Sequence, residues 1–136
     1  LHKAIRRQRQ MCIRDSFNMA YGEDEKQSLI LKCRNEIQKI LSREKEGTKA
    51  LVMSDSNIFV DSVKKDLNVY VIPGRILHVD NQNPDNDFEI MKPFIDFYLI
   101  SEAQKVFSIK NKDMYPSGFP QYAAKVNNIP FERIEL

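Results

Sequence analysis

Apolar residues recur every three or four positions over residues 25–43, which predicts an amphipathic helix. Its apolar positions are Leu29, Ile30, Cys33, Ile37, Ile40 and Leu41, with charged and amide side chains between them. A charged run and then Gly47 follow, and they indicate where this helix ends in a turn.

Short apolar runs alternate with further helical patterns in the rest of the chain. Residues 50–53 predict a strand buried on both faces, and Ser54-Asp55-Ser56 leads into a helix with one face formed by Ile58, Phe59, Ser62 and Val63. Further strands are predicted at 69–72, 105–109 and 131–136 (the last a strand or tail), helices at 94–103 and 119–126, and a polar loop at 75–93. The alternation predicts the α/β class, with a Rossmann-like parallel sheet flanked by helices.

The basic residues are unevenly distributed along the 136-residue chain, which has the length of one domain. Residues 1–16 contain five basic side chains and one acidic side chain, and they lack the apolar core of a secretory signal. This segment also resembles a translated sequencing-adapter read. We therefore expect residues 1–16 to be a non-native leader or a disordered arm, and residues 17–136 to form the folded domain.

The remaining composition excludes several classes of protein. Residues 17–136 contain 16 basic and 18 acidic side chains, which argues against a nucleic-acid partner. No apolar stretch approaches the ~20 residues of a membrane span, so we expect no transmembrane segment. Two cysteines in unrelated contexts indicate a reduced, cytoplasmic protein. His78 and Asp80 are too few ligands for a metal site, and we expect no metal.

Four residues are candidates for binding a ligand at the carboxyl ends of the strands, where ligands lie in open α/β sheets. Asp55 follows a buried strand; it either accepts hydrogen bonds from a ribose or base, or only caps the next helix. Asp96 is a charge among apolar neighbours, and it either binds a base or is stabilised by a helix dipole. Ser117 and Gly118 lead into a helix that is predicted to begin at residue 119, and they form either a phosphate cradle or an ordinary cap and turn.

These residues, in this order, resemble the nucleotide-binding half of GDP-fucose-dependent fucosyltransferases of the GT-B type. The strand ending LVMSDSNIF is followed by Asp96-Phe-Tyr-Leu-Ile-Ser-Glu-Ala103 and then by Ser117-Gly118-Phe119, over about residues 51–134. The resemblance departs from the family in two ways. Gly118 replaces a second Ser or Thr, and the basic His-x-Arg motif of the family is absent.

The resemblance implies that residues 17–136 are half of a GT-B architecture, a truncated domain that binds the nucleotide of a sugar donor. Asp96 would contact guanine or ribose and Ser117 the diphosphate, while Gly118 and Phe119 shape the pocket and Asp55 lies beside it. The donor, with GDP-fucose favoured, would be a substrate, and no cofactor is implied. A glycan acceptor would bind a missing N-terminal domain, so we expect no activity from the chain alone. The alternative is a non-catalytic α/β interaction or regulatory module.

Overall fold

The computed structural model describes residues 8–12, 22–54, 56–73, 87–112 and 117–136. In these residues, the helices are α2 (Glu23–Arg43), α3 (Asn57–Asp66), α4 (Asp87–Ser101) and α5 (Phe119–Val126). The strands are β1 (Gln8–Cys12), β2 (Lys49–Met53), β3 (Tyr70–Val71), β4 (Val106–Lys110) and β5 (Phe131–Glu135). Strands and helices alternate along the chain, so the predicted α/β class is confirmed.

The strands pair in the order β3-β2-β1-β4-β5, and every neighbouring pair is parallel. Strand β1 joins the two outer pairs because β2 and β4 both pair with it. Gln10 of β1 lies opposite Leu51 of β2 on one side and Val106 of β4 on the other. The prediction that neighbouring strands run parallel is therefore confirmed.

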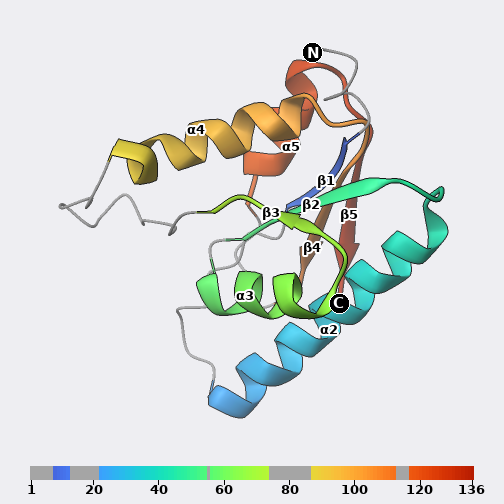
Figure 1. The fold of residues 1–136 in the computed structure, drawn as a ribbon, viewed down its shortest axis with the longest axis vertical. Helices are drawn as coiled ribbons and strands as arrows, with labels where there is room; N and C mark the ends of the chain where they lie inside the picture. Colours follow the sequence, from blue (N-terminus) through green and yellow to red (C-terminus); the bar gives the residue numbers. More distant parts are fainter. Residues whose placement is uncertain (1–7, 13–21, 55, 74–86, 113–116) are drawn as a thin grey trace.

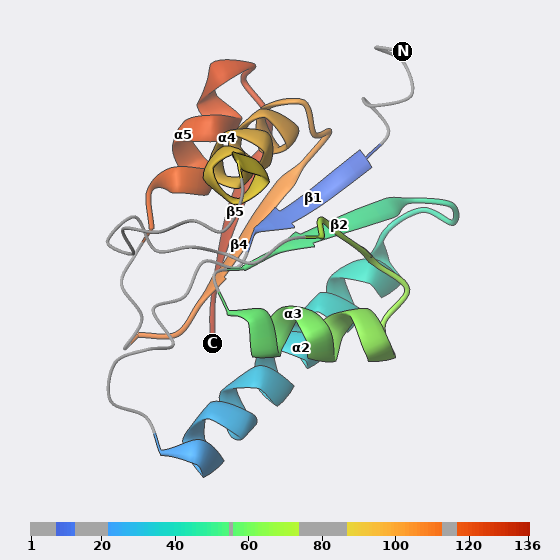
Figure 2. The same ribbon diagram turned by 60° about the vertical axis from the view of Figure 1, so that its left-hand side comes forward.

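Helices cover both faces of the strands: α2 and α3 lie on one side, and α4 and α5 on the other (Figure 1, Figure 2). Alternate residues of β2 point to the two faces, as the pleat of a strand requires. Ala50 and Val52 pack with α2 and α3, whereas Leu51 and Met53 pack with α4 and α5. Each layer of helices thus has its own apolar cluster.

Local sequence signals explain several of the element boundaries. Gly47, in the turn between α2 and β2, has a φ of 81°, which favours glycine. Ser56 is the N-cap of α3, and its hydroxyl accepts a hydrogen bond from the N–H of Phe59 at 3.3 Å. One prediction about this helix was wrong: Ile58 is 65% exposed, whereas Phe59 and Val63 are fully buried.

Strand β1 lies within residues 1–16, which we expected to be a non-native leader or a disordered arm. Neither alternative placed a strand there, yet residues 8–12 pair with two neighbours. The sequence QRQMC has neither apolar alternation nor β-branched residues, so it gives no strand signal. Here the backbone pairing of two adjoining strands, rather than local propensity, defines the element.

Helix α4 begins at Asp87, seven residues before the predicted start at residue 94. The sequence-based boundary was wrong because Pro93 disfavours helical backbone in the residue before it, so residues 87–93 were assigned to the predicted loop. The helix continues through Pro93. Asp96 is therefore in the middle of a 15-residue helix rather than in its first turn.

Strand β1 can be tested by placing a proline between its two neighbours. The substitution Gln10→Pro removes a backbone N–H from a strand paired on both sides, which a central strand does not tolerate. We expect it to destabilise the protein by about 1–3 kcal/mol or more, measured by urea unfolding. The control Gln10→Val keeps the N–H and favours strand backbone. Equal stability of Gln10→Pro and the parent would contradict a central β1 and favour the disordered arm.

Candidate functional site

The predicted site residues that the structure describes lie on α4 (Asp96) and at the start of α5 (Ser117, Gly118 and Phe119). Helices α3 and α5 begin after β2 and β4, so their N-termini lie toward the edge formed by the carboxyl ends of the parallel strands. Helix α4 leads into β4 and therefore runs antiparallel to the strands, so that its beginning also lies toward this edge (Figure 1). This edge is where open α/β sheets bind ligands.

Asp96 forms an ion pair with Lys92 one turn earlier on α4. The Lys92 Nζ donates to Asp96 Oδ2 at 2.7 Å, and the two side chains are only 6% and 15% exposed. The second carboxylate oxygen, Asp96 Oδ1, is buried and has no hydrogen-bond partner among the described residues. A buried oxygen without a hydrogen-bond partner lowers the stability of the folded protein by about 1–3 kcal/mol.

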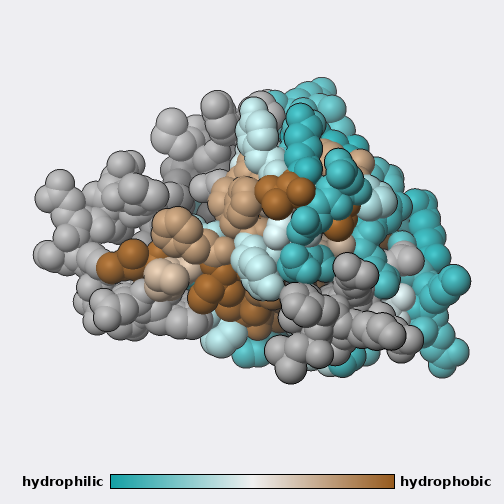
Figure 3. Space-filling model, turned by 90° about the horizontal axis from the view of Figure 1, so that it is seen from above, coloured by the Kyte–Doolittle hydropathy of each residue, from teal (hydrophilic) through white to brown (hydrophobic). Residues whose placement is uncertain are grey.

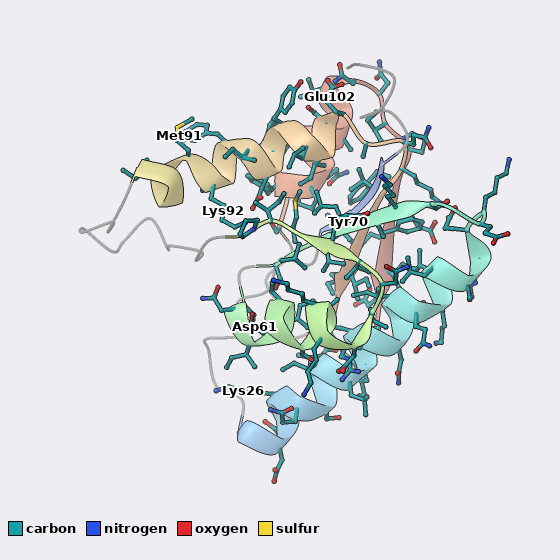
Figure 4. All side chains as sticks on the ribbon, viewed as in Figure 1. Lys26, Asp61, Tyr70, Met91, Lys92 and Glu102 are labelled. Atoms are coloured by element: carbon teal, nitrogen blue, oxygen red, sulfur yellow. The ribbon has the colours of Figure 1, made fainter. Side chains whose placement is uncertain are left out.

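Between residues 91 and 98, α4 has two charged residues on its inner side and apolar residues on its outer side. Lys92 and Asp96 share a helical face with the buried Ile100, at spacings of four residues. Met91, Phe94 and Tyr98 are more than half exposed. Met91 and Lys92 point to opposite sides of α4, with Lys92 toward the end of β3 (Figure 4). From the apolar pattern of the predicted helix at 94–103 we also expected Phe94 and Tyr98 to face inward, and this was wrong.

Helix stability alone does not explain the Lys92–Asp96 pair. An acid preceding a base by four residues is the more favourable order on a helix, and here the order is reversed. Desolvation of a buried pair also offsets most of its Coulomb attraction, so apolar replacements are often neutral or stabilising. The dipole explanation that we considered for Asp96 is wrong, because this effect is confined to the first turn.

An aromatic contact links α4 to the start of α5. The rings of Phe97 and Phe119 meet edge to face, with centroids 5.4 Å apart. This contact brings Phe97, the neighbour of Asp96 in the chain, to the Ser117-Gly118-Phe119 turn. Of the five predicted residues, Asp96 thus lies on the helix that contacts the turn formed by these three.

The Ser117 hydroxyl already takes part in the start of α5. Its Oγ accepts a hydrogen bond from the N–H of Phe119 at 3.3 Å, which leaves the hydroxyl proton available to an acceptor. Pro120, the next residue, has no N–H. Two of the first backbone positions of α5 are therefore unavailable to an anion, so this helix start offers fewer N–H donors than we expected.

Arg133 places a positive charge beside the same turn, and sequence analysis did not single it out. Its Nη2 lies 3.5 Å from the backbone oxygen of Ser117 and 3.4 Å from Gln121 Oε1. Lys92 was also missed as a partner of Asp96. The spacing of four residues on a helix could have indicated that pair, whereas nothing local connects Arg133 with Ser117.

The region around Asp55 is described only through its neighbours, since Asp55 lies outside the described residues. Ser54, at the end of β2, is buried, and its hydroxyl accepts a hydrogen bond from the N–H of Ser56 at 3.1 Å. This is the geometry of a Ser turn followed by a helix cap. His78 and Asp80 also lie outside the described residues.

Two hollows in the described part of the molecule are lined by residues other than Asp96 and the Ser117-Gly118-Phe119 turn. One, of about 360 Å³, follows the edge strand β3 and is lined by Tyr70, Ile72 and Leu99 among others. The other, of about 200 Å³, lies between the start of α2 and Asn111. Among the residues described, no group of three His, Cys, Asp or Glu side chains could hold a metal. None of the described helices is long and apolar enough to cross a membrane.

No protein-family model matches the chain, and neither a curated protein nor a solved structure is significantly similar to it. Any functional conclusion must therefore come from the residues themselves.

Gly118 approaches the chain's own Tyr122 closely. A Cβ at Gly118 would lie 2.7 Å from Cε2 of that ring, so the ring would have to turn. We expect Gly118→Ala and Tyr122→Ala to be coupled by about 0.5–1.5 kcal/mol in a double-mutant cycle of unfolding free energies, because the clash disappears without the ring.

A matched control is Gly22→Ala at the N-cap of α2, where a Cβ would meet nothing within 4 Å. Combined with Tyr122→Ala, it should be additive. Additive effects at Gly118 as well would mean that the Tyr122 ring does not occupy this space, which would then be open to a ligand.

Proposed function

We propose that this chain binds a sugar nucleotide, with GDP-fucose favoured, as the donor-binding half of a glycosyltransferase of GT-B type. The observation on which the proposal depends is the Asp96 carboxylate, which has one buried oxygen without a partner among the described residues and lies on the helix whose Phe97 contacts Phe119 at the start of α5. A buried polar atom without a partner calls for an explanation, and a ligand donor is one.

The strand order supports a Rossmann-like sheet for this proposal. In the classic dinucleotide-binding fold the order is 3-2-1-4-5-6, and the five strands here follow its first five positions. The order reverses between β1 and β4, and a crevice at the carboxyl ends of such strands is the usual place for a nucleotide. Ser117, after β4, belongs to the segment that leads away from this point.

The charges around α5 suit a nucleotide with its diphosphate. Asp96 would accept hydrogen bonds from the base or ribose, and the free Ser117 hydroxyl proton would be donated to a phosphate oxygen. Arg133 adds a positive charge beside Ser117. Because Phe119 and Pro120 offer no free N–H, these side chains would have to contribute more than the helix dipole.

The chemistry proposed for the whole enzyme is an inverting transfer of the sugar. The acceptor hydroxyl oxygen forms a bond to the anomeric carbon while the bond from that carbon to the diphosphate breaks. The leaving nucleoside diphosphate takes the electron pair, and a base in the acceptor-binding domain takes the hydroxyl proton. This chain would supply the stabilisation of the leaving diphosphate.

A second candidate is a non-catalytic interaction module, and an exposed apolar surface favours it. Met91, Phe94 and Tyr98 of α4 are each at least half exposed, as are Tyr122 and Val126 of α5. Seen from above, apolar surface spreads along the α4 side of the molecule (Figure 3). An apolar face of this kind is a common mark of a protein–protein contact.

Nucleotide-dependent thermal stability distinguishes the two candidates. We expect GDP at about 100 times its Kd to stabilise the parent protein by about 2.7 kcal/mol, and ADP and UDP to do less at the same concentration. Asp96→Asn should lose this response, whereas Asp61→Asn, at an exposed position of α3, should keep it. The measurement is the shift of the unfolding midpoint, followed by calorimetric titration.

Comparison of GDP-fucose with GDP-mannose then tests the favoured donor sugar. A parent protein that responds to none of these nucleotides would contradict the donor-binding proposal and leave the interaction module. A response that survives Asp96→Asn would instead remove Asp96 from the site.

A further inference from the structure

Lys92 is a lysine that points inward at the edge where the proposed ligand binds. Lys92 is only 5% exposed as a whole residue, and its ammonium group donates a hydrogen bond to Asp96 Oδ2. Apolar residues that could have filled this inner face instead lie on the outer face of α4. A charged pair is therefore buried at inward positions of α4 where apolar side chains could have been buried.

The pair leaves the two oxygens of Asp96 in different situations. Oδ2 accepts from Lys92, whereas Oδ1 is buried without a partner among the described residues. A carboxylate on a single side-chain bond can rotate, and a fixed cation on one oxygen determines where the other oxygen points. Because Oδ1 has less than 1 Å² of exposed surface, neighbouring side chains must shift before a ligand can reach it.

We infer that Lys92 is a positioning residue of the nucleotide site, an inference that rests on the proposed function. It holds Oδ2 so that Oδ1 remains a single acceptor for one N–H or O–H donor of the nucleotide. Lys92 itself touches no ligand, and it acts only through Asp96. The site therefore selects ligands that present a donor to Oδ1, either an amino group of the base or a hydroxyl of the ribose.

The first test is the affinity of Lys92→Met for GDP by calorimetric titration. A hydrogen bond to a charged acceptor corresponds to roughly a tenfold or greater change in affinity, and we expect this loss. Lys92→Arg, which can still pair with the carboxylate, should recover most of it. The matched control is Lys39→Met, because Lys39 also pairs with an acid of its own helix, Glu36, at 2.9 Å but is exposed.

Lys92→Met leaves a buried carboxylate without its cation, and this variant could fail to fold. The double variant Lys92→Met with Asp96→Asn removes both charges and keeps the test valid. Since Lys92 acts through Asp96, the double variant should bind GDP as weakly as Asp96→Asn alone. A further loss in the double variant would mean that Lys92 contacts the ligand directly, and it would overturn the inference.

Guanosine, which has no phosphate, separates positioning from phosphate binding. If Lys92 is a positioning residue, Lys92→Met should lower the affinities for guanosine and for GDP by the same factor. If Lys92→Met lowered the affinity for GDP but not for guanosine, Lys92 would be assigned to the phosphates, and the inference would be overturned. A merely structural role would not alter selectivity among ligands that differ in one donor.

Two analogues identify the donor. IDP lacks the 2-amino group of GDP, and 2′-deoxy-GDP lacks a ribose hydroxyl. The analogue without the donor for Oδ1 should bind the parent roughly tenfold more weakly than GDP, and Asp96→Asn should no longer distinguish the two. Equal binding of GDP and both analogues would leave N1–H and the 3′-hydroxyl as donors, which 1-methyl-GDP and 3′-deoxy-GDP remove. Equal binding of GDP and all four analogues to the parent would overturn the inference.

The outcomes also separate this inference from the proposed function. A parent protein that binds no nucleotide contradicts both. A parent that binds GDP, with Lys92→Met binding equally well, contradicts only the role of Lys92.

Discussion

The packing of α4 against α5 determines how the Lys92–Asp96 pair lies relative to the Ser117-Gly118-Phe119 turn. The Phe97–Phe119 ring contact joins the two helices near the start of α5. At their other ends, the side-chain amide of Asn127 donates to the backbone oxygen of Ser101 at 2.8 Å and to Glu102 Oε1 at 3.1 Å. With α4 attached at two places, the rotation of the helix is restricted, and Lys92 and Asp96 are kept on the inner face.

Elements with strong local signals agreed with the sequence, and elements without them did not. The bounds of α5 were predicted correctly because its apolar spacing and its start are both local. The start of α4 was wrong because residues around Pro93 do not have a helical pattern. Strand β1 has no apolar pattern at all, and its pairing depends on strands far away in the chain. Non-local pairing of this kind leaves no trace in a short window of sequence.

The candidate site was predictable as a set of residues but not as an arrangement. Asp96 was a candidate because it is a charged residue among apolar neighbours, and in the structure its side chain is largely buried. Its partner and burial were missed because the usual rule, with apolar residues inward, is reversed at the start of α4. Burial depends on which way a helix is turned, and here this is decided by contacts such as Phe97–Phe119 rather than by the helix sequence. Asp55 remains a prediction.

The central position of β1 has a consequence for the order of folding. Strands β2 and β3 are joined by the single helix α3, and β4 and β5 by the single helix α5, so each pair can form over one crossover connection. The two pairs meet only when β1, from the beginning of the chain, pairs with β4 beyond residue 105. Closing so long a loop costs entropy before any contact compensates for it, so this step should limit the folding rate. During translation, β1 is made before β4, so one of its two edges stays unpaired until β4 has also been made.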